Sequence, residues 1–238
     1  MFLGHFKIKT KFGLTNLETR QNWIKKTLLE CESGKILDVG AGECQYKKYC
    51  DHLDYTSQDF NQYNGKGNNL GLQTNTWDVS QVDVISDIIS IPLPDDSFDI
   101  ILCTEVLEHV PDPIAAINEM NRLLKKGGLI IITAPFCSLT HFAPYHFCDG
   151  FNSNFFKYHF LERLYYKSIT IDVNGNYFEY LSQELHRLPL IVNSYTKKSS
   201  FLIKIYSKIL INILEYVNKK HNNSHELLCF GHHVKAIK

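Results

Sequence analysis

The chain has 238 residues, 44% of them hydrophobic, and its 25 Lys plus Arg balance 25 Asp plus Glu. This length fits one α/β domain with some elaboration, and a charged share of 21% is too low for a disordered chain. The balanced charge argues against a dedicated nucleic-acid binder, although a local basic patch stays open.

The seven cysteines form no CxxC pair and show no zinc-like spacing. Residues 1–10 contain no continuous apolar run of the kind an export signal needs. An odd number of cysteines without such a signal indicates reduced thiols, so we expect a cytoplasmic protein.

One strongly apolar segment, Ser200 to Val217, invites a membrane interpretation. It is interrupted by Lys204, Lys208 and Glu215, and therefore falls short of the uncharged run that a spanning helix needs. We expect a buried or lid helix here, with weak association with a membrane surface as the alternative.

Up to residue 134 the chain alternates predicted helices and strands. In chain order these are a helix (16–31), a strand (35–39), a helix (43–52), three strands (55–58, 82–86, 98–103), a helix (111–124) and a strand (129–133). The helix over 111–124 starts on Asp112-Pro113 and is followed by Lys125-Lys126-Gly127-Gly128, which is typical of a helix start and stop. This alternation predicts a doubly wound parallel sheet.

The composition and periodicity of the chain change after residue 134. Residues 135–165 are dense in aromatic side chains and histidines and show no clear period. A strand over 168–173, a helix beginning near Asn174 and a closing strand near 230–237 are predicted after them. No linker marks a second domain, so we expect a single domain over 1–238, with a cofactor-binding core over about 16–136 and an acceptor-side insert over about 137–225.

Acidic residues follow consecutive predicted strands. In an open α/β sheet, ligands bind at the carboxyl ends of the strands. Asp38, Asp59 and Asp87 lie in or beside these ends, so three strands deliver a carboxylate to one crevice. Gly40 and Gly42 let the backbone approach a ligand where a Cβ would clash.

Two nucleotide cofactors fit such a crevice. The dinucleotide fingerprint fails, because Gln45 stands where its third glycine belongs, and Glu43 at the helix start would repel a pyrophosphate. S-adenosyl-L-methionine has no phosphate and carries cationic sulfonium and ammonium groups, so it suits an acidic crevice. Asp59, 21 positions after Asp38, can accept hydrogen bonds from ribose hydroxyls, and Asp87 from an adenine amino group.

The motifs that carry a family resemblance are Ile36–Gly42, Asp59, Asp87–Ile100, Glu105–Val110 and Leu124–Ile130. In this order they resemble the class I S-adenosylmethionine-dependent methyltransferases, of the type 11 group. The resemblance implies a seven-stranded Rossmann-like sheet whose last strand is antiparallel. Cys44 departs from it, because the family often has a third glycine there.

The strand ends and the resemblance together predict the cofactor-binding residues. These are Asp38, Gly40, Ala41, Gly42, Asp59, Phe60, Asp87, Ile88, Cys103, Thr104 and Glu105. Two other functions remain open: an NAD(P)-dependent oxidoreductase on a similar sheet, and a non-catalytic cofactor-binding module.

The sequence motifs identify the acceptor-binding residues less specifically than the cofactor-binding residues. Transfer from a sulfonium depends on holding the acceptor atom behind the methyl group, and a base is needed only where the acceptor loses a proton. We predict His109 and His146 as catalytic residues, with His141 and Asp149 as further candidates. The run Thr140–Phe147 can cover the methyl group, and its rings suit a sugar or an aromatic acceptor, although such a run is often a local core.

We therefore expect O- or N-methylation of a small-molecule or carbohydrate-like acceptor, with no nucleic-acid partner. Residues 174–184, together with the insert, are similar to methyltransferases of bacterial surface-polysaccharide and small-molecule pathways. The oligomeric state stays open.

A metal is a further alternative. Glu105, Glu108 and His109 lie on one face if their segment is helical, and this pattern resembles methyltransferases of ubiquinone synthesis and of small-RNA 3′ ends, some of which hold a divalent metal there. With His141 or His146 added, magnesium, manganese or zinc could bind. Many relatives instead use Glu105 for the cofactor and the rest for packing, so no metal ligand is assigned.

Overall fold

The structure is a computed structural model that describes residues 10–220 and 223–238. Nearly all of the stretch in which no export signal was expected, residues 1–9, therefore lies outside the described residues. Contacts divide the chain into a smaller unit, residues 10–20 with 173–230, and a larger unit, residues 21–172 with 231–238. The insert expected over about 137–225 is thus shared between the two units.

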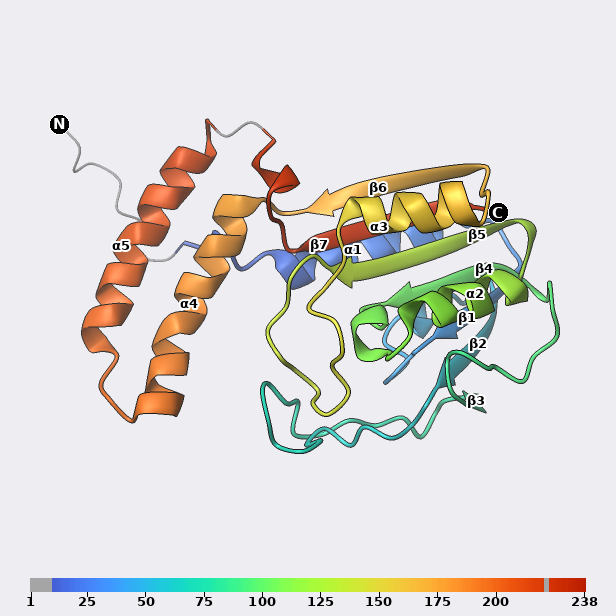
Figure 1. The fold of residues 1–238 in the computed structure, drawn as a ribbon, viewed down its shortest axis with the longest axis horizontal. Helices are drawn as coiled ribbons and strands as arrows, with labels where there is room; N and C mark the ends of the chain where they lie inside the picture. Colours follow the sequence, from blue (N-terminus) through green and yellow to red (C-terminus); the bar gives the residue numbers. More distant parts are fainter. Residues whose placement is uncertain (1–9, 221–222) are drawn as a thin grey trace. The chain divides into compact units, whose positions relative to one another are not determined.

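The larger unit is built on a seven-stranded sheet with the order β3-β2-β1-β4-β5-β7-β6 (Figure 1). The strands are β1 (Lys35–Val39), β2 (Asp54–Asp59), β3 (Val84–Ile85), β4 (Phe98–Thr104), β5 (Leu124–Pro135), β6 (Ser168–Asn174) and β7 (Gly231–Ile237). The first five pair in parallel, and β7 runs antiparallel to β5. The predicted fold, with an antiparallel last strand, is confirmed.

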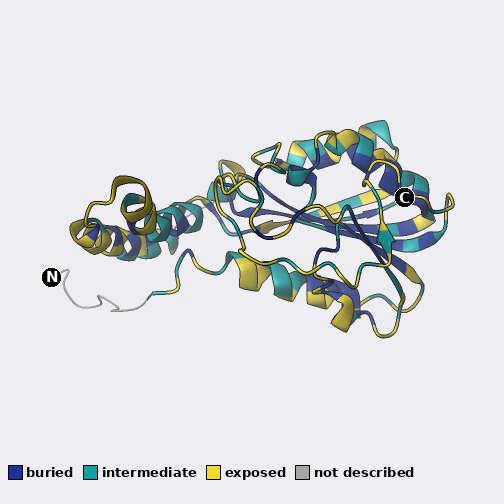
Figure 2. Ribbon diagram, turned by 90° about the horizontal axis from the view of Figure 1, so that it is seen from below, coloured by how far each residue is buried: buried dark blue, intermediate teal, exposed yellow. Residues whose placement is uncertain are grey.

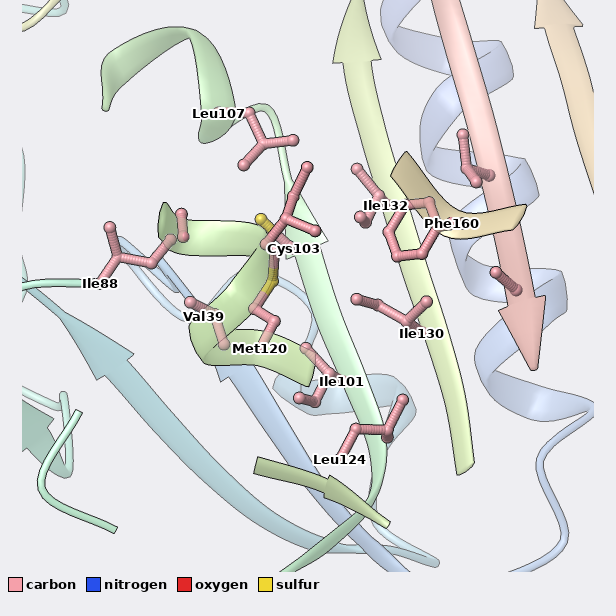
Figure 3. Close-up of a cluster of buried hydrophobic side chains, with 14 of the residues drawn as sticks. Val39, Ile88, Ile101, Cys103, Leu107, Met120, Leu124, Ile130, Ile132 and Phe160 are labelled. Carbon is pink, nitrogen blue, oxygen red and sulfur yellow. The ribbon is translucent and has the colours of Figure 1, made fainter. Parts of the chain in front are cut away.

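Side chains of the central strands alternate between two buried layers, as parallel strands covered on both faces require. On one face, α1 (Asn16–Leu29) places Ile24 and Leu28 against Ile36 of β1. On the other face, α2 (Pro113–Leu123) packs on the strands (Figure 3). The side chains labelled there are Val39, Ile88, Ile101, Cys103, Leu107, Met120, Leu124, Ile130, Ile132 and Phe160.

The predicted helix over 43–52 is wrong, and the Glu105–His109 segment, whose helical form was a condition for placing its side chains on one face, is not an α-helix. In place of a helix over 43–52, the chain turns and forms only a 3-10 helix, η1 (Lys47–Tyr49), because Gly42 and Cys44 adopt left-handed φ angles of 52° and 53°. The segment around Glu105–His109 also contains only a 3-10 helix, η2 (Leu107–His109), and Glu105 itself has a φ of 53°. A left-handed residue interrupts α-helical geometry in both cases.

The predicted helix over 111–124 is confirmed with shifted ends. The carboxylate of Asp112 accepts hydrogen bonds from the backbone of Ile114 and Ala115, which fixes the start of α2. The end of α2 differs from the prediction, because β5 begins directly at Leu124. Residues 125–128, expected as a glycine stop, extend the strand, and Gly127 donates to the Lys238 carbonyl. The aperiodic stretch 135–165 contains α3 (Ser153–Lys157) and a π-helix, η3 (Tyr158–Arg163).

The smaller unit is dominated by two packed helices, α4 (Tyr177–Thr196) and α5 (Phe201–Asn218), followed by a 3-10 helix, η4 (Ser224–Glu226). Asn176 caps α4 by accepting from the backbone of Phe178 and Glu179, which explains the helix start expected near Asn174. Much of the surface of the two helices is exposed (Figure 2). Among the described residues, no helix combines the length and the apolar character that crossing a bilayer would need.

Candidate active site

A cavity of about 460 Å³ lies in the larger unit, at the carboxyl ends of β1, β2, β3 and β4. Its walls are formed by strand ends, by the loop after β2 and by the aromatic run after β5. The lining residues are Gly40, Gln58, Asp59, Phe60, Gln62, Tyr63, Trp77, Ile85, Ser86, Asp87, Ile88, Glu105, Val106, His109, Val110, Pro111, Phe142, Tyr145 and Phe147.

The turn after β1 requires glycine. Gly40 has a φ of 66°, and a Cβ built there would lie 2.5 Å from a methyl carbon of Val106. Gly42 has a φ of 52°, and its Cβ would lie 2.5 Å from the Trp77 ring. Both the backbone conformation and the close approach of a neighbour therefore disfavour a side chain at these two positions.

Gly40→Ala is expected to lower the free energy of unfolding by about 2 kcal/mol, because the left-handed backbone is strained with a Cβ and Val106 must move. Gly127→Ala is the control, since Gly127 also has a positive φ, 77°, but nothing lies within 4 Å of its Cβ position. Urea denaturation should give a loss of about 1 kcal/mol or less for Gly127→Ala. Equal losses for the two variants would show that Val106 does not constrain Gly40.

The carboxylate of Asp59 ties the end of β2 to the glycine turn. Its two oxygens accept hydrogen bonds from the backbone of Gly42 at 3.0 Å and of Asn61 at 2.8 Å. The neighbouring Gln58 accepts from the Gly40 backbone at 3.3 Å and donates to the Ser86 carbonyl at 2.7 Å. The ends of β1, β2 and β3 are thereby held together around the cavity.

Six of the predicted cofactor residues line this cavity: Gly40, Asp59, Phe60, Asp87, Ile88 and Glu105. Among them, Asp59, Asp87 and Glu105 are carboxylates, and the described residues of the lining include neither lysine nor arginine. The charge of the wall is therefore acidic, as the sequence predicts.

The other five predicted residues, Asp38, Ala41, Gly42, Cys103 and Thr104, are not among the lining residues. Side chains alternate along a strand, so Asp38 faces the same side of the sheet as Ile36, where it accepts a hydrogen bond from the Tyr55 hydroxyl at 2.7 Å. Burial raises the pKa of Asp38 to about 7. Cys103 is fully buried in the layer beneath α2.

Aromatic residues after β5 cover the cavity by packing on the loop after β2. Phe142 stacks on Tyr63 with ring centroids 4.5 Å apart, and Tyr145 meets Phe60 edge to face at 4.9 Å. The backbones also join, because Leu72 donates to the Thr140 carbonyl and Phe142 donates to the Leu72 carbonyl, each at 2.9 Å. The run Thr140–Phe147 therefore forms part of the cavity wall.

Several lining residues were missed at the level of sequence: Gln58, Gln62, Tyr63, Trp77 and Val106 among them. Most lie in irregular segments without periodicity, where no spacing rule applies. The density of aromatic residues after β5 was the available signal, and it indicated only that loop.

His109 lies in the wall with one ring nitrogen engaged. Its Nδ1 is 2.5 Å from the carbonyl oxygen of Tyr145, and the ring stacks on Phe142. A carbonyl only accepts, so Nδ1 carries the proton and Nε2 keeps its lone pair in the neutral ring. Burial, together with the nearby His141 and His146, lowers the pKa of His109 to about 3.

Glu108, His109 and His141 each offer a ligand atom, and these atoms lie within 4.8 Å of one another. His141 resembles His109 in that its Nδ1 lies 2.8 Å from a backbone carbonyl, that of Leu139. His146 lies near both rings, but its Nε2 is 3.1 Å from the Ser138 hydroxyl, and it is not a lining residue. Asp149 is likewise outside the lining.

Comparison with known sequences gives a family match over most of the first five strands and over the glycine turn. The family described as "Methyltransferase domain" matches residues 37–132. A ubiquinone biosynthesis O-methyltransferase of Leptothrix cholodnii is 27% identical over 48% of this chain and 49% of its own length. A demethylmenaquinone methyltransferase of Staphylococcus haemolyticus is 28% identical over 50% of this chain and 52% of its own. The chain thus spans about half the length of the curated relatives it matches.

Solved structures resemble the whole fold. A SAM-dependent methyltransferase from Archaeoglobus fulgidus has a TM-score of 0.55 at 19% identity, covering 94% of this chain and 93% of that one. The YcgJ protein from Bacillus subtilis has a TM-score of 0.52 at 15% identity, covering 93% and 98%. At such low identities the likeness concerns the fold.

Proposed function

We propose that this chain is a class I S-adenosylmethionine-dependent methyltransferase, that its cavity binds S-adenosyl-L-methionine and that a small-molecule or carbohydrate-like acceptor receives the methyl group; the match of residues 37–132 to the methyltransferase domain supports this. One observation carries the proposal: within the part of the chain that the structure describes, the cavity at the carboxyl ends of four strands is lined by three carboxylates and by no lysine or arginine. Such a wall favours a cationic ligand and disfavours a phosphate.

The residues present fit this cofactor. The volume of about 460 Å³ is in the usual range for small-molecule sites, about 300–1,000 Å³. Asp59 and Asp87 would accept hydrogen bonds from the ribose and adenine groups, Phe60 and Ile88 would contact the ring, and the backbone at Gly40 allows close approach. The bound cofactor supplies an electrophilic methyl group on its sulfonium.

Asp59→Ala is expected to weaken S-adenosylhomocysteine binding by about 1–3 kcal/mol, because it removes a buried acceptor from the cavity wall. Isothermal titration calorimetry measures this affinity. Asp54→Ala is the control, since Asp54 lies at the opposite end of the same strand and its side chain is 69% exposed. The cofactor proposal fails if the folded wild-type protein does not bind, or if the two variants bind equally well.

The acceptor would enter beside the aromatic wall. Phe142, Tyr145 and Phe147 offer ring faces, and the Nε2 atom of His109 can accept a proton from an acceptor hydroxyl. The O-methyltransferase name of the Leptothrix relative supports transfer to oxygen, with transfer to nitrogen kept as the alternative. The proposed location is the cytoplasm, and the seven cysteines agree with it, since none forms a disulfide within the described residues.

The two other functions predict different results. An NAD(P)-dependent oxidoreductase would change NADH fluorescence on mixing, but the acidic wall disfavours its pyrophosphate. A non-catalytic module would bind S-adenosylmethionine without turnover over a broad acceptor panel.

Binding of a divalent metal ion is a second candidate function of the side chains beside the cavity. Glu108, His109 and His141 bring one carboxylate and two imidazoles together, and both Nδ1 atoms lie against backbone carbonyls, as is usual for metal-binding histidines. Such an ion would polarise the acceptor oxygen.

Removal of metal tests whether a divalent ion takes part in methyl transfer. If an ion takes part, treatment with EDTA is expected to lower turnover by about tenfold or more, and added Mg²⁺, Mn²⁺ or Zn²⁺ is expected to restore it. Turnover that is unchanged after dialysis against EDTA, with cofactor binding intact, would leave His109 as a proton acceptor alone.

A further inference from the structure

Helix α5 is apolar on two opposite sides. Ser207, Ile211 and Leu214 are buried, and their spacing places them on one face of the helix. At about 100° per residue, the exposed apolar side chains fall on the opposite face. Six of these are Leu202, Ile205, Tyr206, Ile209, Ile213 and Tyr216, with exposed fractions from 39% to 68%. A helix that is apolar nearly all round is normally covered on both sides.

A polar strip runs between the two apolar faces on one side of the helix. Lys204, Lys208 and Glu215 lie on it, and Lys204 and Lys208 are one turn apart and both exposed. The flexible lysine stems can lie along the apolar face while their ammonium groups stay in a polar layer beside it.

The charge of the segment 188–220, which comprises the end of α4, the turn and α5, is strongly one-sided. Between residues 188 and 220 there are six lysines and a single carboxylate, Glu215, and Thr10 donates a hydrogen bond to that carboxylate. The lysines are Lys197, Lys198, Lys204, Lys208, Lys219 and Lys220, all of them exposed. Within the described residues they form no ion pair with a carboxylate.

We propose that the outer face of α5, with the turn that joins it to α4, lies on the surface of an anionic lipid bilayer. The apolar side chains would enter the boundary of the acyl chains, and the lysines beside them would contact acidic headgroups. A second copy of this chain fits less well, because pairing the same faces would bring the two sets of lysines together. The helix lies on the bilayer and does not span it, in agreement with the absence of a spanning helix among the described residues.

Co-sedimentation of the full chain with lipid vesicles tests the proposal. We expect the partition coefficient to be at least about tenfold higher for phosphatidylcholine vesicles that contain phosphatidylglycerol than for phosphatidylcholine alone, and to fall as salt is raised. Binding needs no cofactor, so failure of the methyltransferase proposal would leave this result unchanged.

Two pairs of variants locate the surface. Leu202→Glu with Tyr206→Glu is expected to lower vesicle binding by about tenfold or more, because both side chains, 63% and 68% exposed, belong to the outer face. The control introduces the same changes into the larger unit, as Leu70→Glu with Tyr165→Glu, at positions 64% and 83% exposed. Circular dichroism and S-adenosylhomocysteine titration check that each variant is folded.

A second pair of variants tests the contribution of lysine charge to vesicle binding. Lys204→Gln with Lys208→Gln is expected to reduce binding to the anionic vesicles, whereas Lys157→Gln with Lys167→Gln, also exposed, is expected to leave it unchanged. The proposal is overturned if the folded wild-type chain stays in the supernatant with anionic vesicles, or if the Leu202/Tyr206 variant binds as the wild type does. A dimer that this variant dissociates, seen by sedimentation velocity without any vesicle binding, would instead assign the face to a second copy.

Discussion

His109→Gln is expected to lower the turnover of a hydroxyl acceptor by about 10²–10⁴-fold, the usual contribution of a positioned general base. The basis is geometric: His109 lines the cavity, and its Nδ1 is held by the Tyr145 carbonyl, which leaves Nε2 to accept a proton. Affinity for S-adenosylhomocysteine should change little, because the ring acts on the acceptor side. The measurement is kcat with an acceptor found by panel screening, beside calorimetric titration of the cofactor product.

His146→Gln is the matched control for this experiment. The Nε2 atom of His146 lies 3.1 Å from the Ser138 hydroxyl, and the residue does not line the cavity, so we expect a loss of at most about tenfold. His146 was predicted as a second catalytic residue, and a loss equal to that of His109 would support that prediction. If His109→Gln retains turnover within about threefold, the base assigned here is wrong.

Asp38→Asn is expected to stabilise the folded protein at pH 8 relative to the wild type, by up to about 4 kcal/mol. Burial raises the pKa of Asp38 to about 7 in the folded state, far above the ordinary value of 3.8. The contribution of this carboxyl group is therefore fully favourable below about pH 4 and is lost as the pH rises through about 7. Asparagine keeps an acceptor for Tyr55 and carries no charge to bury.

The measurement is urea denaturation of both proteins from pH 4 to pH 8, and the difference between them isolates Asp38. Asp99→Asn is a control of opposite sign, because a hydrogen bond from Lys125 lowers the pKa of Asp99 and makes its ionised form favourable. Its removal should therefore reduce stability at neutral pH and have less effect as the pH falls. A constant difference between Asp38→Asn and the wild type across this range would show that Asp38 is ionised throughout.

The order of the elements could be predicted from the sequence alone. Continuous apolar runs marked β4 and β5, and the Asp112-Pro113 pair marked the start of α2, since burial on both faces and helix capping are local demands on residue type. The carboxylates at the end of β2 and after β3 were predicted from the topology: parallel strands end at one edge, so Asp59 and Asp87 reach one cavity.

The direction of single side chains and the packing of distant loops were decided only by the tertiary structure. The alternation of β1 turns Asp38 away from the cavity, and left-handed residues at Gly42 and Cys44 replace a predicted helix by turns. The wall around Phe142 and His109 joins loops far apart in the chain, and no local pattern encodes such a pairing. Local propensity selects an element, but the face that it buries and the loops that cover it depend on contacts between segments distant in sequence.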